Sequence, residues 1–192
     1  MKIARQLIGM TILMGAAVIA AWGWAAADEP MSKDRAVRAV AILHPTAGNN
    51  ARGTVWFTRV ADGVQIEADV QGLAPGKHGF HIHELGNCSA ADATSAGGHY
   101  NPDGHPHAGP EQKNRHMGDL GNIEADSNGW AHYDRLDDYI VLNGAKSIIG
   151  RAVIIHAGED NLKSQPTGDA GSRVACGVIG IVAKQPSSQQ VR

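Results

Sequence analysis

Seven residues of types that bind metal ions lie within 76 consecutive positions of the chain. They are His81, His83, His99, His107, His116, Asp119 and His156. Imidazole nitrogens bind both copper and zinc, and one carboxylate among imidazoles is an ordinary donor set for zinc. Seven donors are one too few for two separate four-coordinate ions, but they suffice if one imidazole bridges two ions through both ring nitrogens. The set therefore predicts a binuclear copper–zinc site, with redox chemistry at the copper.

The spacing of these donors indicates which elements must position them. His81 and His83 are two residues apart in an extended run, so both side chains should lie on one face while Phe80 and Ile82 point into the core. His156 ends a second strand-like run and can meet the pair across the fold. A long loop should supply the other four donors, which are His99, His107, His116 and Asp119.

Other histidines have simpler interpretations. His105 lies two residues before His107 and is an alternative zinc donor. His44 and His132 stand alone and are expected on the surface. His78 should face away from His81 and make a structural hydrogen bond instead of binding metal.

The N-terminal residues 1–27 resemble a secretory signal peptide. Lys2 and Arg5 precede an apolar run of 18 residues, 7–24, and an A-x-A cleavage site ends at Ala27. An uncleaved membrane anchor is the alternative, because 18 residues reach the lower limit for a membrane-spanning helix. Cleavage predicts a periplasmic or secreted protein with no membrane attachment, beginning with a short N-terminal segment, 28–35.

The charge and cysteine content restrict the function further. Removing Lys2 and Arg5 with the leader takes the formal charge from −2 to −4, which leaves nothing basic enough to bind nucleic acid. The two cysteines, Cys88 and Cys176, predict one disulfide in an exported protein.

The body of the chain is predicted to be all-β, a Greek-key barrel or sandwich of about eight antiparallel strands formed by residues 36–183. Short β-rich runs are separated by turn sequences such as Ala74-Pro75-Gly76 and Asn143-Gly144. The clearest runs are 37–43, 54–60, 64–70, 78–83, 130–136 and 152–156. Two long segments, 84–117 and 157–172, are rich in Gly, Pro and polar residues, and loops of this kind are usually functional. A polar tail, 184–192, follows.

Several motifs in this chain resemble signatures of the copper/zinc superoxide dismutases. They are H-G-F-H-I-H-E, G-G-H-Y-N-P, H-A-G-P, R-H-M-G-D-L-G-N and G-S-R-V-A-C-G-V-I-G. The resemblance implies one copper per subunit, bound by His81, His83, His99 and His156. It implies one zinc per subunit, bound by His99, His107, His116 and Asp119, with His99 as the bridge. The match to the family's zinc-loop spacing favours His107 over His105.

The resemblance also implies roles for residues around the metals. A disulfide between Cys88 and Cys176 would pin the long loop to the last strand. Arg173 matches the arginine that guides the substrate, and Thr167 matches a residue of the channel wall. Asp160 matches a carboxylate that links a copper-binding His to a zinc-binding His. The resemblance further implies an ion pair between Arg115 and Asp137, where the zinc loop meets the sixth strand.

The function implied is the dismutation of superoxide to oxygen and hydrogen peroxide, which would protect the exported compartment from oxidative damage. Arg173 and His99 would act in catalysis. A non-catalytic copper/zinc buffer and a copper-delivery protein of the same fold are the alternatives. Two loop lengths favour the exported bacterial type, whereas 147–151 and 177–181 resemble the dimer surface of the animal type. The resemblance implies a homodimer, but the location of its interface and the alternative of a monomer stay open.

Overall fold

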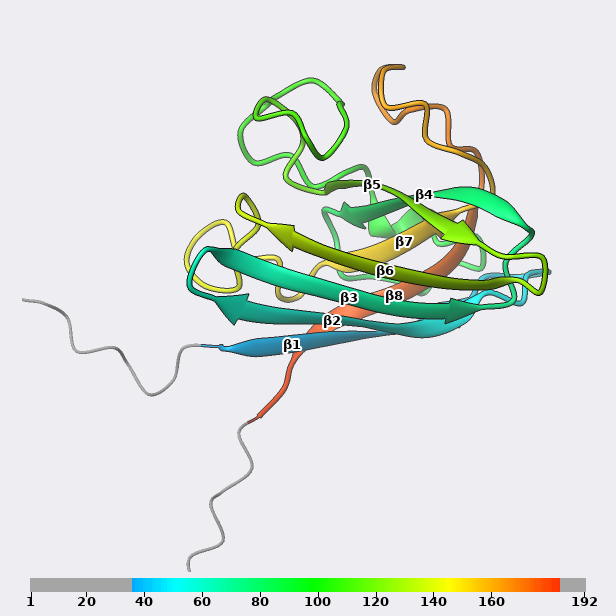
Figure 1. The fold of residues 1–192 in the computed structure, drawn as a ribbon, viewed down its shortest axis with the longest axis horizontal. Helices are drawn as coiled ribbons and strands as arrows, with labels where there is room; N and C mark the ends of the chain where they lie inside the picture. The colour runs from blue at the N-terminus through cyan, green and yellow to red at the C-terminus, as the bar shows by residue number, and fades with distance from the viewer. Residues whose placement is uncertain (1–35, 184–192) are drawn as a thin grey trace, which may run out of the picture. The chain divides into compact units, whose positions relative to one another are not determined.

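Eight antiparallel strands close into a barrel in the computed structural model, which describes residues 36–183 (Figure 1). Their order around the barrel is β1-β2-β3-β6-β5-β4-β7-β8. The chain therefore crosses between non-neighbouring strands after β3 and after β6, as in Greek-key folds. The predicted fold class is confirmed. The strands are β1 (Arg38–Pro45), β2 (Arg52–Val60), β3 (Gly63–Gln71), β4 (Gly76–His83), β5 (Asp119–Ala125), β6 (Trp130–Asp137), β7 (Ala152–His156) and β8 (Arg173–Ile181).

Strands β1, β2, β3 and β6 form the regular side of the barrel, and they lie side by side in Figure 1. In β3, Ile66 and Ala68 are buried while the intervening Glu67 is exposed, so one face packs on the core and the other meets solvent. This alternation is why the sequence pattern located these strands well.

Strand β7 is buried along its whole length, which shows that both of its faces are covered. Its Ala152 and Ile154 pack with Ala93, Ala96 and Cys176 in a small cluster separate from the main core. Ala93 precedes the 3-10 helix η1 (Thr94–Ala96) in the long β4–β5 connection, and Ala96 is the last residue of that helix. That connection therefore lies against β7, the strand that ends in His156.

Strands β5 and β8 were not among the runs that the sequence singled out. Each contains at least one glycine that interrupts a β-rich pattern, and the structural reasons for these glycines differ. Gly121 in β5 has φ +80°, a conformation that other residues rarely adopt. Gly177 in β8 lies so close to β1 that an added Cβ would be 2.4 Å from the Ile42 carbonyl oxygen.

The predicted signal peptide, the 28–35 segment and the polar tail lie outside the described residues, and these assignments stay predictions. Within residues 36–183, no helix is long and apolar enough to cross a membrane.

Candidate metal centre

The first donor group joins two neighbouring strands to the long loop. His81 and His83 come from β4, and His156 ends β7, which pairs with β4. His99 comes from the β4–β5 connection and forms an isolated β-bridge with His83. One ring nitrogen of each of these four buried residues lies within 4.8 Å of the others.

Four buried nitrogens in this group have no hydrogen-bond partner in the described part of the chain. They are His81 Nδ1, His83 Nε2, His99 Nε2 and His156 Nε2. Buried polar atoms are normally paired, so four orphaned nitrogens facing one point need a specific explanation. A metal ion that accepts their lone pairs supplies one, and the residues present therefore fit a metal.

The opposite nitrogens of three rings are held by oxygen acceptors. His81 Nε2 lies 2.8 Å from Asp160 Oδ2, while His83 Nδ1 and His156 Nδ1 lie 2.9 Å from the carbonyl oxygens of Gly97 and Gly171. A ring that donates its N–H to an oxygen keeps its other nitrogen free for a metal, and this arrangement is typical of metal-binding histidines.

Burial keeps these rings neutral. Desolvation is the main cause that lowers the pKa of His81 to about 3 and that of His156 to about 4, and the neighbouring His99 lowers both further. The pKa of His83 is also lowered, again mainly by burial. Neutral imidazole is the form that binds metal, so the group is prepared for a cation at physiological pH.

The second donor group consists of His99, His107, His116 and Asp119, all buried. Three imidazoles converge on one carboxylate oxygen: Asp119 Oδ1 lies 2.8, 3.0 and 3.2 Å from Nδ1 of His99, His107 and His116. The other oxygen, Oδ2, accepts the backbone N–H groups of His116 and Ala108. Burial would raise the pKa of Asp119, but the three imidazoles hold it well below its usual range.

His99 belongs to both donor groups. Its Nε2 is among the unpaired nitrogens of the first group, and its Nδ1 faces Asp119 and His116 in the second. The two ring nitrogens thus face different donor sets, which is the geometry that a bridging imidazole requires.

Asp160 is a member of neither donor group, but its carboxylate contacts one histidine of each. Its Oδ2 faces His81 Nε2 at 2.8 Å, and its Oδ1 faces His107 Nε2 at 3.0 Å, as the sequence comparison implied. Burial opposes its charge, yet the two imidazoles lower the pKa of this carboxyl. The backbone of Asp160 exchanges two hydrogen bonds with the Asn122 side chain on β5, which fixes the carboxylate in place. Sequence reasoning did not single out Asn122, although it ends the R-H-M-G-D-L-G-N motif.

His107 belongs to the second group, and His105 does not. His105 is half-buried, with Nδ1 3.2 Å from the Arg115 carbonyl oxygen. His44 and His132 are exposed, as expected. His78 is buried, and its two ring nitrogens each lie 2.8 Å from a carbonyl oxygen, of His156 and of Ala74, so its role is structural as predicted.

The expected ion pair between Arg115 and Asp137 is present and buried. Arg115 Nη2 lies 2.5 Å from Asp137 Oδ2, and the side chains are 2% and 0% exposed. Arg115 Nη1 also donates to the carbonyl oxygens of His116 and Met117. The pair therefore ties the end of the long β4–β5 connection to β6.

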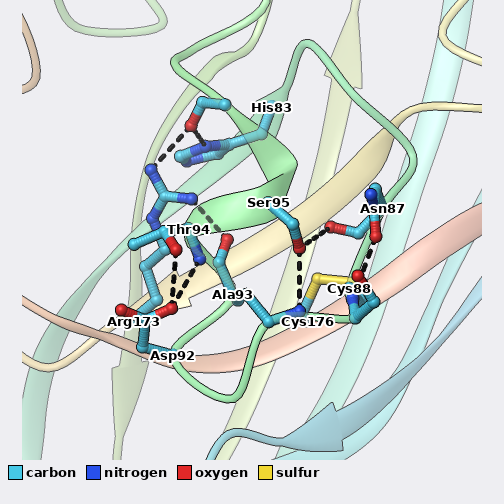
Figure 2. The surroundings of a disulfide bond; sticks show 12 residues. His83, Asn87, Cys88, Asp92, Ala93, Thr94, Ser95, Arg173 and Cys176 are labelled. Carbon is cyan, nitrogen blue, oxygen red and sulfur yellow. Dashed lines mark hydrogen bonds between the residues drawn. A yellow bond between two sulfur atoms is a disulfide. The ribbon is translucent and has the colours of Figure 1, made fainter.

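The predicted disulfide is confirmed: Cys88 in the long loop is bonded to Cys176 in β8. Figure 2 shows the chain beyond Cys88 folding back so that Ala93 lies beside the Arg173 guanidinium. Arg173 Nη1 donates to the Ala93 carbonyl oxygen at 2.5 Å, and Nη2 donates to that of Gly97 at 2.6 Å. Gly97 is also the acceptor for His83, so Arg173 is held beside the first donor group (Figure 2).

Thr167 is half-buried in the β7–β8 connection, immediately before Gly168. Gly168 has φ +73°, and an added Cβ would lie 1.9 Å from Asp160 Oδ1 and 2.7 Å from His107 Nε2. Only glycine fits there, because this loop packs directly on the carboxylate that joins the two groups.

A family model described as copper/zinc superoxide dismutase (SODC) matches residues 51–179, and the chain belongs to this family. Among solved structures, the chain is similar to one described as the clock protein EA4, with 44% sequence identity and a TM-score of 0.71. The match covers 77% of this chain and 96% of that one. Family membership, the barrel and the two histidine-rich groups agree in indicating a metal-binding protein.

Proposed function

We propose that the protein is a copper/zinc superoxide dismutase that converts superoxide to oxygen and hydrogen peroxide. The observation that carries this proposal is the position of Arg173. A guanidinium held by two carbonyl oxygens beside four metal-directed imidazoles suits the binding of a small anion, and metal storage alone does not require it.

The donor chemistry supports copper in the first group and zinc in the second. The first group offers four imidazole nitrogens and no carboxylate, which suits copper. The second adds one carboxylate to three imidazoles, an ordinary donor set for zinc. His81, His83, His99 and His156 would hold one copper per subunit, and His99, His107, His116 and Asp119 one zinc.

Copper, when bound, would supply one-electron redox chemistry, taking an electron from one superoxide and giving it to a second, whereas zinc has no redox chemistry. The chain's own residues would bind the anion and manage the protons. Arg173 would orient superoxide through its guanidinium N–H groups, and its charge would attract the anion to a protein of net negative charge. His99 would accept a proton from water at Nε2 and pass it to the peroxide, which would take its second proton from water, while Nδ1 of the same ring would remain a zinc donor beside Asp119.

Arg173→Glu tests this proposal against the metal-buffer and copper-delivery alternatives. Reversing the charge should sharply reduce the rate of superoxide loss while both metals stay bound, because no donor atom changes. Arg173→Lys should be milder, since the charge is kept. The wild-type rate should fall as salt screens the field beyond about 8–10 Å. An Arg173→Glu protein with the wild-type rate and salt dependence would contradict the guiding role.

We also propose that the protein is exported, of the bacterial type, and acts in the periplasm or outside the cell. The signal-peptide pattern of residues 1–27 and the disulfide both support export. The N-terminal sequence of the protein isolated from its host tests cleavage after Ala27, and retention of residues 1–27 would support a membrane anchor instead.

A homodimer is the assembly that we propose. Val178 and Ile181 in the segment 177–181, which resembles the animal-type dimer surface, are 43% and 61% exposed. Leu85 is 52% exposed and follows Glu84, whose carbonyl oxygen accepts a hydrogen bond from Arg151 in the other such segment, 147–151. Sedimentation of the wild type and of Val178→Asp would test whether β8 forms the interface. Unchanged dimers in the variant would place the interface elsewhere, and a monomeric wild type would refute the assembly.

A further inference from the structure

We propose that Gln165 is a positioning residue that fastens the β7–β8 loop to the backbone of His107 and thereby slows the release of zinc. This inference rests on the proposed binding of zinc by the second donor group. It concerns a residue that touches no donor atom and that neither the sequence pattern nor the family resemblance singled out.

The Gln165 side chain pairs with both backbone groups of His107. Its Oε1 accepts the His107 N–H at 2.8 Å, and its Nε2 donates to the His107 carbonyl oxygen, also at 2.8 Å. Nε2 makes a further bond to the Lys163 carbonyl oxygen at 3.2 Å within its own loop. The primary amide thus acts like a peptide group of a neighbouring strand, and it needs both a donor and an acceptor to do so.

This contact supplies what the other partners of His107 do not. Asp119 and Asp160 hold the two ring nitrogens, but they leave the position of the backbone open. His107 lies in the long β4–β5 connection, where no strand pairing fixes its main chain. Gln165 provides that fixation from the opposite loop.

An apolar contact of the same loop lies close by. Leu162 packs on Gly109, where an added Cβ would be only 3.3 Å from its Cδ1. The β7–β8 loop therefore holds the main chain of His107 through Gln165 and the chain two residues later through Leu162. With both contacts in place, the His107 imidazole faces zinc from a backbone that has little freedom to move. Zinc release therefore requires this part of the β7–β8 loop to open.

The test compares two substitutions of Gln165 with a matched control. Gln165→Leu removes both hydrogen bonds. Gln165→Glu has nearly the same shape, but its carboxylate cannot donate to the His107 carbonyl oxygen at pH 7. Gln112→Leu makes the same chemical change at an exposed position of the other loop. The readouts are the rate of zinc transfer to a chromogenic chelator and the exchange rate of the His107 amide hydrogen in the metal-free protein.

Gln165→Leu should release zinc about five- to tenfold faster than the wild type, because both partly exposed hydrogen bonds are lost. Its His107 amide should exchange faster by a similar factor. Gln165→Glu should release zinc faster by a smaller factor, because its carboxylate still accepts the His107 N–H and only the bond to the His107 carbonyl oxygen is lost. Gln112→Leu should stay within about twofold of the wild type in both assays. Wild-type zinc release and wild-type His107 amide exchange in Gln165→Leu would overturn the proposal.

The two assays also separate this inference from the proposed function. A wild-type protein that binds no zinc would refute the metal assignment, whereas amide exchange in the metal-free protein would still decide whether Gln165 fastens His107.

Discussion

The buried ion pair between Arg115 and Asp137 permits a quantitative prediction. Asp137→Asn keeps the shape of the side chain, including the oxygen that accepts the backbone N–H groups of Tyr139 and Ile140. It removes the charge opposite a guanidinium that is 2% exposed. Leaving one buried charge without its partner costs about 3–5 kcal/mol. In a domain of this size that corresponds to a fall in Tm of about 6–20 °C.

The assay is urea unfolding of the metal-free protein with its disulfide intact, carried out for both single variants and the double variant. Arg115→Met should also be clearly destabilising, because it leaves the buried Asp137 carboxylate with only the more distant Arg135 Nε, 3.8 Å away. The double variant should cost clearly less than the sum of the two, since neither charge remains. Lys77 and Glu159 form the matched control, because their side chains are 48% and 57% exposed. Glu159→Gln should cost at most about 1 kcal/mol. An Asp137→Asn cost below about 1 kcal/mol, or strict additivity, would refute this reasoning.

Three further predictions follow from the site. Gly168→Ala should lower the zinc affinity tenfold or more while the barrel stays folded, because the added methyl group would clash with the Asp160 carboxylate that joins both groups. Zinc titration together with circular dichroism checks this, and a wild-type zinc affinity would contradict it. Cys176→Ser should destabilise the metal-free protein by up to about 4–5 kcal/mol in urea, because the disulfide closes a loop with a sequence separation of 88; a cost below about 1 kcal/mol would contradict this estimate. At pH 5.5, NMR of the metal-free protein should find His81 and His156 neutral, since burial lowers their pKa to about 3 and about 4, whereas exposed His132 should be protonated beside its carboxylate partner. Because the unfolded chain then binds more protons than the folded protein, the free energy of unfolding of the metal-free protein should fall as the pH drops from about 6.5 toward 4. A protonated His81 at pH 5.5 would contradict the lowered pKa of this residue.

Much of this architecture could be predicted because its determinants are local. The alternation in β3 and the H-x-H spacing in β4 follow directly from strand geometry, which places His81 and His83 on one face. The disulfide was predictable because only two cysteines are present. Strands β5 and β8 were missed because Gly121 adopts a positive φ and Gly177 lies against β1, and neither requirement is visible in the sequence before the fold is in place.

The parts of the site that sequence reasoning missed are contacts with the main chain. The carbonyl oxygens of Gly97 and Gly171 fix two of the metal-directed rings, and a carbonyl acceptor has no residue signature. Asn122 and Gln165 likewise bond to backbone groups of residues far away in the sequence. The choice between His105 and His107 depended on the family's spacing, because two histidines two residues apart are chemically equivalent until the loop has folded.

The most direct test of the account is the rate of superoxide loss in the presence of the copper- and zinc-loaded protein, measured before and after selective removal of copper. The account predicts rapid loss that disappears when copper is removed and returns when copper, but not zinc, is added back. A fully loaded protein that accelerates the reaction no more than its copper-free form would contradict the proposed dismutase activity and favour a copper-storing or copper-delivering role.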